Sequence, residues 1–287
     1  MATYDLHQHL WPEPFVAALR ARALPPRLAH DELVTIEGRF PIDLSDHDPE
    51  RRAEVLDRDG IDVAVLSLQP NLGLELLVEA ERAELEEAWV EGVTEILASS
   101  RRFLALSPTR PRDGFVGVSV GADTLLDLAA PAATFDEIER RGLLLFVHPD
   151  AGAAADPSRP SWWEWVVGYP AQMQAAYLAW LADGRERWPR LRVLFAILAG
   201  GGPLQLERLA HQGVDVRSTL DPNVFFDVAT YGRRAIELCV ETFGVAQLAY
   251  GSDTPVVDPR TTLAAVRGFG DSVMQILQTD TPTRLLR

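Results

Sequence analysis

The feature that most constrains the fold of this chain is an alternation of short apolar runs, rich in β-forming residues, with longer segments of helical periodicity. Several of the runs are almost continuously apolar, which is typical of parallel strands buried on both faces. The pattern repeats eight times along the sequence. The eight predicted strands are Ala2–Leu6, Ile61–Leu68, Phe103–Leu106, Phe115–Val120, Leu143–Val147, Leu191–Leu198, Val224–Val228 and Gln247–Tyr250.

Predicted helices lie between these strands. They are Glu50–Arg58, Leu74–Ala98, Thr134–Arg140, Gln172–Ala182, Pro203–Gln212, Tyr231–Phe243 and Arg260–Arg267. Alternating strands and helices predict an α/β fold with a parallel sheet. Eight strands in 287 residues predict closure as a (β/α)8 TIM barrel, because such barrels typically need about 250 residues. We expect a single domain over residues 1–287, with a small β-hairpin, Leu33–Ile42, inserted after the first strand.

The composition excludes several classes of partner. There are 42 acidic and 27 basic residues, all of the latter arginine, and the formal charge is −15. Such a chain does not attract polyanions, so we expect neither nucleic acid nor a membrane as a partner. The N-terminus lacks the features of a signal peptide. The single cysteine, Cys239, excludes an internal disulfide and indicates a cytoplasmic location, and its apolar surroundings predict a buried structural role.

Four side chains that can ligate a metal ion lie at predicted carboxyl ends of strands. His7 and His9 follow the first strand, His148 ends the fifth, and Asp253 follows the eighth. Residues two apart in an extended segment point the same way, and the carboxyl ends of barrel strands carry the active site. Three imidazoles and one carboxylate suit one divalent ion, with zinc favoured and manganese or iron as alternatives. The structural alternative for Asp253 is a helix N-cap.

These motifs resemble the metal signatures of the amidohydrolase superfamily. The matching segments read DLHQH at Asp5–His9, VHP at Val147–Pro149 and GSDTP at Gly251–Pro255. The stretch Gly184–Pro203 and the final Pro282–Leu286 resemble the amidohydrolase-related branch that includes aminocarboxymuconate semialdehyde decarboxylase and resorcylate-type decarboxylases. The resemblance covers almost the whole chain. It implies a metal-dependent barrel enzyme with His7, His9, His148 and Asp253 at the metal positions.

The sequence departs from this family at one position. Members of the family normally carry a histidine in the sixth-strand motif, where this chain has Ile197. In the family that histidine binds a second metal or polarises the substrate, and isoleucine can do neither. The chain also has no lysine to carboxylate as a bridge between two ions. Both observations favour one metal ion rather than two.

The predicted site is compatible with more than one reaction. Our main interpretation is hydrolysis of an amide, ester or lactone, in which metal-bound water attacks and Asp253 moves the proton, with His148 as the second catalytic candidate. The first alternative is non-oxidative decarboxylation of a small aromatic or unsaturated acid, with Asp253 as acid and base. The second is an inactive or altered barrel, which Ile197 motivates.

Loops after the strands supply candidate substrate contacts. We single out Trp11, Arg110, Trp162 and Tyr231, because tryptophan-rich loops suit an aromatic substrate and an arginine suits its carboxylate. The alternatives are a lid core or subunit interface for the tryptophans and surface positions for the arginines. We expect a small-molecule substrate and allow a homodimer. Three histidines outside the motifs, His30, His47 and His211, are expected at surface or helix-face positions. The glycine triplet Gly200–Gly202 is expected to form a tight turn.

Overall fold

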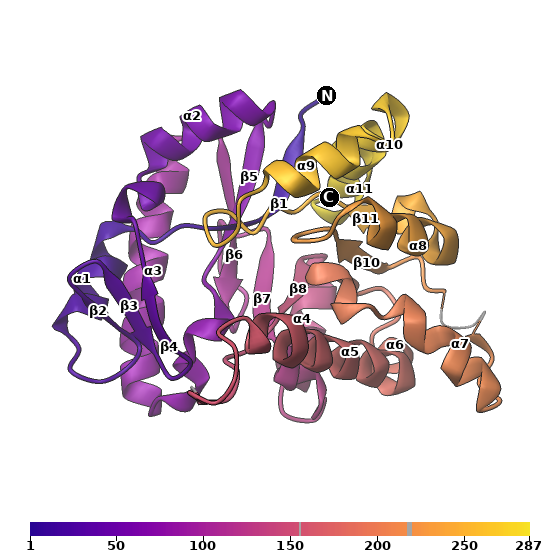
Figure 1. Ribbon diagram of the computed structural model, residues 1–287, viewed down its shortest axis with the longest axis horizontal. Coiled ribbons are helices and arrows are strands. Elements are labelled where there is room, and N and C mark those ends of the chain that lie inside the picture. Colours follow the sequence, from indigo (N-terminus) through magenta and orange to yellow (C-terminus); the bar gives the residue numbers. More distant parts are fainter. Residues whose placement is uncertain (155, 217–219) are drawn as a thin grey trace.

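Eight parallel strands form one sheet in the computed structural model, which describes residues 1–154, 156–216 and 220–287. Their order around the sheet follows the chain, β1-β5-β6-β7-β8-β9-β10-β11 (Figure 1). The strands are β1 Tyr4–His9, β5 Val63–Ser67, β6 Phe103–Pro108, β7 Gly117–Gly121, β8 Leu144–His148, β9 Arg192–Phe195, β10 Val224–Asp227 and β11 Leu248–Ala249. Each overlaps one of the eight strands predicted from the sequence, so the fold prediction is confirmed.

The first and last strands meet and close the barrel. The backbone N–H of Leu6 donates to the carbonyl of Tyr250 at 3.0 Å, and that of Asp253 donates to the carbonyl of His7 at 2.8 Å. Beyond the end of β11, Gln8 forms a parallel bridge with Thr254. The segment that carries Asp253 is therefore hydrogen-bonded directly to the segment that carries His7.

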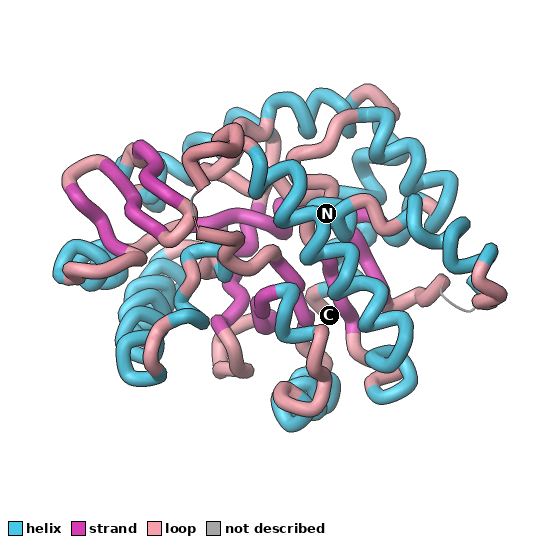
Figure 2. The backbone as a smooth tube through the Cα atoms, turned by 60° about the horizontal axis from the view of Figure 1, so that its bottom comes forward, coloured by secondary structure: helices cyan, strands magenta, loops and turns pink. Residues whose placement is uncertain are grey.

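Helices alternate with the strands and cover the barrel (Figure 2). They are α1 Glu13–Ala21, α2 Pro49–Asp59, α3 Glu79–Ser99, α4 Ala132–Arg141, α5 Tyr169–Ala179, α6 Arg185–Arg187, α7 Pro203–His211, α8 Arg233–Phe243, α9 Arg260–Arg267, α10 Asp271–Gln275 and α11 Thr281–Leu285. Asp48 caps α2, and its carboxylate accepts from the N–H of Arg51 at 2.8 Å. No helix among the described residues is long and apolar enough to span a membrane.

The segment between β1 and α2 is larger than the predicted hairpin. It begins with α1, which the sequence analysis missed, and continues as a three-stranded antiparallel sheet of β2 Arg27–Ala29, β3 Glu32–Thr35 and β4 Gly38–Pro41. The three strands lie together at one side of the molecule (Figure 2). The sequence pattern did not predict β2, because Arg27–Ala29 is too short for an alternating pattern to be recognised.

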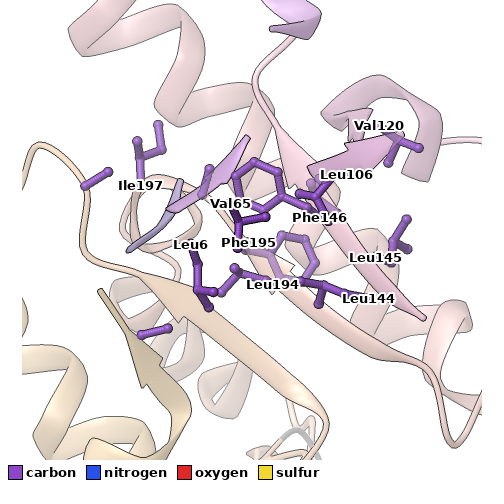
Figure 3. Packing of buried hydrophobic residues seen from close by; sticks show 14 of the residues in the cluster. Leu6, Val65, Leu106, Val120, Leu144, Leu145, Phe146, Leu194, Phe195 and Ile197 are labelled. Atoms are coloured by element: carbon purple, nitrogen blue, oxygen red, sulfur yellow. The ribbon is translucent and has the colours of Figure 1, made fainter. Parts of the chain in front are cut away.

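The barrel interior is apolar below the strand ends. Phe146 of β8 and Phe195 of β9 are fully buried and belong to one hydrophobic cluster with Leu6 and Val65. Figure 3 shows part of this cluster, in which Leu6, Val65 and Leu106 lie near the two phenylalanines. Phe146 also contacts the ring of His7, with centroids 5.0 Å apart. The apolar packing therefore continues up to the level of the first predicted ligand.

A buried arginine forms hydrogen bonds where the first and last barrel strands meet. Arg52 of α2 is 2% exposed. Its guanidinium donates to the side-chain oxygen of Gln8 at 2.9 Å, to the carbonyl of His9 at 3.1 Å and to that of Asp46 at 2.6 Å. Burial lowers the pKa of Arg52 to about 10, so the group remains charged at neutral pH. Its hydrogen bonds fix the end of β1, where His9 lies.

We predict that Arg52→Met destabilises the protein by about 3 kcal/mol, because it leaves several buried acceptors without a donor. The measurement is the free energy of unfolding in urea. The matched control is Arg51→Met, because the Arg51 side chain on the same helix is 51% exposed and an exposed ion pair contributes at most about 1 kcal/mol. Equal losses for the two variants would contradict this role for Arg52.

Candidate metal centre

The four predicted ligands meet at the carboxyl end of the barrel. One donor atom from each of His7, His9, His148 and Asp253 lies within 4.8 Å of the donor atoms of the other three. Nε2 of His7 is 3.1 Å from Nε2 of His9. Oδ1 of Asp253 lies 3.4 Å from Nε2 of His7 and 3.2 Å from Nε2 of His9. The histidines are almost fully buried, and the Asp253 side chain is 13% exposed.

Each histidine is oriented by a hydrogen bond from its other ring nitrogen. Nδ1 of His7 lies 2.8 Å from Oδ2 of Asp227, Nδ1 of His9 lies 3.0 Å from the carbonyl of Ser67, and Nδ1 of His148 lies 2.8 Å from the carbonyl of Pro149. These acceptors carry no proton, so each Nδ1 must donate. The Nε2 lone pairs are then left for a ligand, which is the usual arrangement of histidines that bind metal.

The geometry of the cluster fits a small divalent cation. In a tetrahedral site with metal–ligand distances of about 2.1 Å, neighbouring donor atoms are about 3.4 Å apart. The three distances among Nε2 of His7, Nε2 of His9 and Oδ1 of Asp253 are 3.1–3.4 Å. Two Nε2 lone pairs at 3.1 Å repel each other unless a proton or a cation lies between them. The described residues therefore contain a metal-binding cluster.

The ionisation of the cluster follows from burial and from the charges it contains. Burial favours the neutral form of His7, but the carboxylates of Asp227 and Asp253 outweigh it and raise the pKa of His7 to about 9. Burial and the charge on His7 lower the pKa of His9 and of His148. Burial opposes ionisation of Asp253, yet the three imidazoles keep its pKa below the ordinary value. The carboxylates thus favour a positive charge at this point, which a bound divalent cation would supply.

Asp227 is the residue of this centre that sequence reasoning missed. It is fully buried at the end of β10. Its Oδ2 accepts from His7, and its Oδ1 accepts from the N–H groups of Ile197 at 2.9 Å and Ala229 at 3.0 Å. The signal was present, because an acidic residue interrupts the apolar run Val224–Val228. The sequence could not show which histidine it would face.

Ile197 lies where the family has a histidine, and its backbone is unusual. Ile197, Leu198 and Ala199 have φ values of 45°, 51° and 49°, and Gly200 follows with 61°. A side chain at Gly200 would overlap the carbonyl of Pro170, so this position requires glycine. The predicted tight turn after the sixth barrel strand is thus present, and the Asp227 carboxylate holds its first N–H group.

The four candidate substrate contacts have different surroundings. Trp11 is buried and donates from Nε1 to Oε1 of Gln69 at 2.6 Å. The Arg110 side chain is 66% exposed and pairs with Glu87. Trp162 is half exposed, and Tyr231 packs with partial burial against the hydrophobic core. Of the four, Trp11 is nearest in the sequence to a predicted metal ligand, because it lies two residues after His9.

Two expectations about other residues have opposite outcomes. Cys239 is buried, as predicted, and burial raises its pKa to about 12, which keeps the thiol protonated. His47 was expected on the surface or on a helix face, and it lies in the short 3-10 helix Leu44–His47. The surface alternative is wrong, because His47 is 4% exposed and stacks on Trp11 with ring centroids 4.5 Å apart. Its Nδ1 accepts from the N–H of Trp11 at 3.1 Å. The polar sequence around His47 concealed its burial against Trp11.

Comparison with known proteins agrees with the fold and the resemblance. No family model matches the chain. A curated relative, 2-amino-3-carboxymuconate-6-semialdehyde decarboxylase of Dictyostelium discoideum, is 23% identical over 318 residues, covering 95% of this chain and 88% of the relative. The apo structure of IDCase from Metarhizium anisopliae has a TM-score of 0.83 at 19% identity, covering 100% of this chain and 97% of the other.

Two further solved structures are similar. A 5-carboxyvanillate decarboxylase from Sphingomonas paucimobilis has a TM-score of 0.77 at 18% identity, covering 100% and 99% of the two chains. A dihydroxybenzoic acid decarboxylase from Polaromonas with bound manganese has a TM-score of 0.74 at 14% identity, covering 99% and 96%. The chain therefore has the fold of metal-dependent barrel enzymes, and its resemblance to the decarboxylase-like branch of the amidohydrolase superfamily is confirmed.

Replacing His148 tests the cluster as a metal site. We predict that the wild-type protein holds about one equivalent of divalent metal and that His148→Ala lowers the affinity more than the 10–100-fold typical of losing an outer partner. Metal content after gel filtration is the measurement, with circular dichroism to confirm the fold. His211→Ala is the control, because His211 is exposed on α7. An unchanged metal content in His148→Ala would sink the assignment.

Replacing Asp227 tests its effect on the His7 ring. In Asp227→Asn the amide oxygen can still accept from Ile197, which turns the amide NH2 toward Nδ1 of His7 and forces the proton onto Nε2. We predict a 10–100-fold weaker metal affinity with little change in fold. The measurement is competition against a chelator, with Asp258→Asn at an exposed position as control. Equal affinity in the two variants would show that Asp227 has no part in tuning the site.

Proposed function

We propose that this chain is a metal-dependent decarboxylase that acts on a small aromatic or unsaturated carboxylic acid with an oxygen next to the carboxylate. The observation that carries the proposal is the buried convergence of His7, His9, His148 and Asp253 on one point. Two of the similar structures are named as amidohydrolases, but the curated relative and several other similar structures are named as decarboxylases. They favour our first alternative over hydrolysis, which was the main interpretation of the sequence.

The proposed ligands are the three Nε2 atoms and the carboxylate of Asp253. The donor set favours zinc, and the manganese in the Polaromonas structure makes manganese the first competitor. We propose one ion, because no second group of at least three ligand-type side chains occurs in the described part of the chain and the sequence has no lysine. When bound, the ion would supply chelation of the substrate carboxylate and the adjacent oxygen.

Asp253 is the proposed acid and base. Its lowered pKa makes it a carboxylate in the resting site, so it can accept the proton of a substrate hydroxyl. It then returns that proton to the ring carbon that carries the carboxylate. The carbon–carbon bond breaks, its electron pair stays on the ring, and CO2 leaves. A proton from solvent restores the hydroxyl, so the net reaction consumes one proton.

The surroundings of the centre suggest how a ring would be held. Trp11 is fixed by Gln69 and by stacking on His47 and follows His9 by two residues, so we propose its ring as an aromatic contact for the substrate. Trp162 and Tyr231 remain candidates for the outer part of the substrate site. Arg110 can hold a carboxylate only after leaving Glu87, with which its guanidinium pairs at 3.3 Å. A homodimer also remains a prediction.

The reaction is tested with metal-loaded protein and a panel of hydroxybenzoic acids in D2O. We predict release of CO2 and one deuterium at the vacated ring carbon. Asp253→Asn, assayed at saturating metal, should lower kcat by about 10²–10⁴-fold, the usual contribution of a positioned acid–base group. Asp258→Asn is the matched control.

Parallel assays with aryl esters, amides and lactones in 18O-labelled water distinguish the main alternative. Incorporation of 18O into a product, with no CO2 from any acid, would replace decarboxylation by hydrolysis. Absence of both reactions in protein that holds one equivalent of metal would favour the inactive barrel that Ile197 raised.

A further inference from the structure

The metal centre has little contact with solvent. His7 and His9 are 0% exposed and His148 is 4% exposed, and Asp253 shows 13% of its side chain. A chelator or an aromatic acid needs far more room than this to approach the four ligands. Access to such a centre requires a segment at the rim of the barrel to move.

The inserted sheet contacts the rim of the barrel through its outer strand. Glu37 lies between β3 and β4, and its carboxylate accepts from the hydroxyl of Tyr169 at 2.6 Å and from the backbone N–H of Gly152. Phe40 of β4 contacts the ring of Trp165, with centroids 6.1 Å apart. Figure 1 shows β4 beside the segment that leads into α5. The two hydrogen bonds join residues that are 132 and 115 positions apart in the chain.

These contacts are made with loops that surround the metal centre. Gly152 follows the strand β8, which ends with one of the proposed ligands. Asn71, in the loop after β5, donates from Nδ2 to the hydroxyl of Tyr169 at 3.3 Å. Burial and the charges of Glu37 and Asp253 raise the pKa of Tyr169, so the hydroxyl keeps the proton that it donates to Glu37. The inserted sheet is therefore attached close to the entrance of the centre.

The two edges of the inserted sheet are held differently. In β2, Leu28 is 4% exposed and belongs to the hydrophobic core of the barrel. None of the four residues of β4 is buried. Segments with little buried apolar surface open at a lower free energy than the core does. The β4 edge can therefore leave the rim while β2 stays in place.

A second carboxylate limits the strength of the attachment. Oε2 of Glu164 and Oε1 of Glu37 lie 2.8 Å and 3.0 Å from the position that a Cβ atom at Gly152 would occupy. The two carboxylates thus face the same small space, where like charges repel. Burial and the charge of Glu164 raise the pKa of Glu37. Hydrogen bonds stabilise the closed arrangement and repulsion weakens it, as a segment that opens reversibly requires.

We propose that residues 36–41 are a gate to the metal centre and that Glu37 keeps this gate closed. In the closed state its carboxylate joins the inserted sheet to Tyr169 and Gly152. When these two bonds break, β4 moves away from the rim, and the centre exchanges metal or substrate with solvent. The inference rests on the metal centre and not on the reaction proposed for it.

The test is the rate of zinc exchange in the full-length protein, measured by stopped flow against the chromogenic chelator 4-(2-pyridylazo)resorcinol. We expect Glu37→Ala to raise the rates of binding and release by the same factor, about tenfold or more, because each lost bond involves a charged acceptor. The equilibrium affinity should stay unchanged. A gate sets how often the centre is open and not how tightly its ligands hold the ion.

Three further variants give different expected results. Tyr169→Phe removes one of the two donors and should raise both rates less than Glu37→Ala does. Glu164→Gln removes the repulsion and should lower both rates. Glu32→Gln is the matched control, because Glu32 lies in β3 of the same sheet, pairs with Arg39 and has a side chain that is 47% exposed. Both of its rates should equal those of the wild type.

Hydrogen exchange of the Gly152 amide, measured in the presence of EDTA, tests the gate without metal. This amide donates to Glu37, so its exchange should be faster in Glu37→Ala and slower in Glu164→Gln.

Two results would overturn the proposal. One is that Glu37→Ala exchanges both zinc and the Gly152 amide at wild-type rates. The other is that its faster zinc release is matched by an equal loss of affinity, which would show damage to the centre instead of opening. Failure of the metal centre itself would appear as a wild-type protein that binds no zinc. Failure of the proposed reaction would change neither measurement, so the three are distinguishable.

Discussion

The hydrogen bond between His7 and Asp227 joins β1, which carries His7 and His9, to β10 on the other side of the closing strands. Asp227 is fully buried and its two oxygens accept three N–H groups. A buried carboxylate without such donors would be strongly unfavourable. With them it fixes the tautomer of His7, so that Nε2 faces His9 and Asp253. The other proposed ligands can share one metal ion with His7 because this hydrogen bond holds the ring in a single orientation.

The same carboxylate holds a strained turn. Left-handed backbone costs roughly 1–2 kcal/mol for each residue with a side chain, and Ile197, Leu198 and Ala199 all adopt it. The N–H of Ile197 is satisfied by Asp227, and the carbonyl of Gly200 accepts from Gln174. Through Asp227, the backbone of this turn is hydrogen-bonded to the same carboxylate that orients His7.

The sequence predicted the parts of the molecule that depend on local pattern. The eight apolar runs gave the strands, because burial on both faces leaves a continuous apolar signature. His7, His9, His148 and Asp253 were found because strand ends in a barrel share one rim. Asp227 and the buried His47 were missed because their roles depend on partners far along the chain: Asp227 pairs across 220 residues. No local periodicity encodes such a contact.

Strand β10 explains how one short segment can serve two environments. Its Phe226 packs with the aromatic rings of α5 and α8, while the adjacent Asp227 faces His7. The strand is held on both sides, by β9 and β11, so its two faces cannot move independently. Because Asp227 accepts from both the His7 ring and the N–H of Ile197, a shift of the aromatic layer would reach both the orientation of that ring and the left-handed turn.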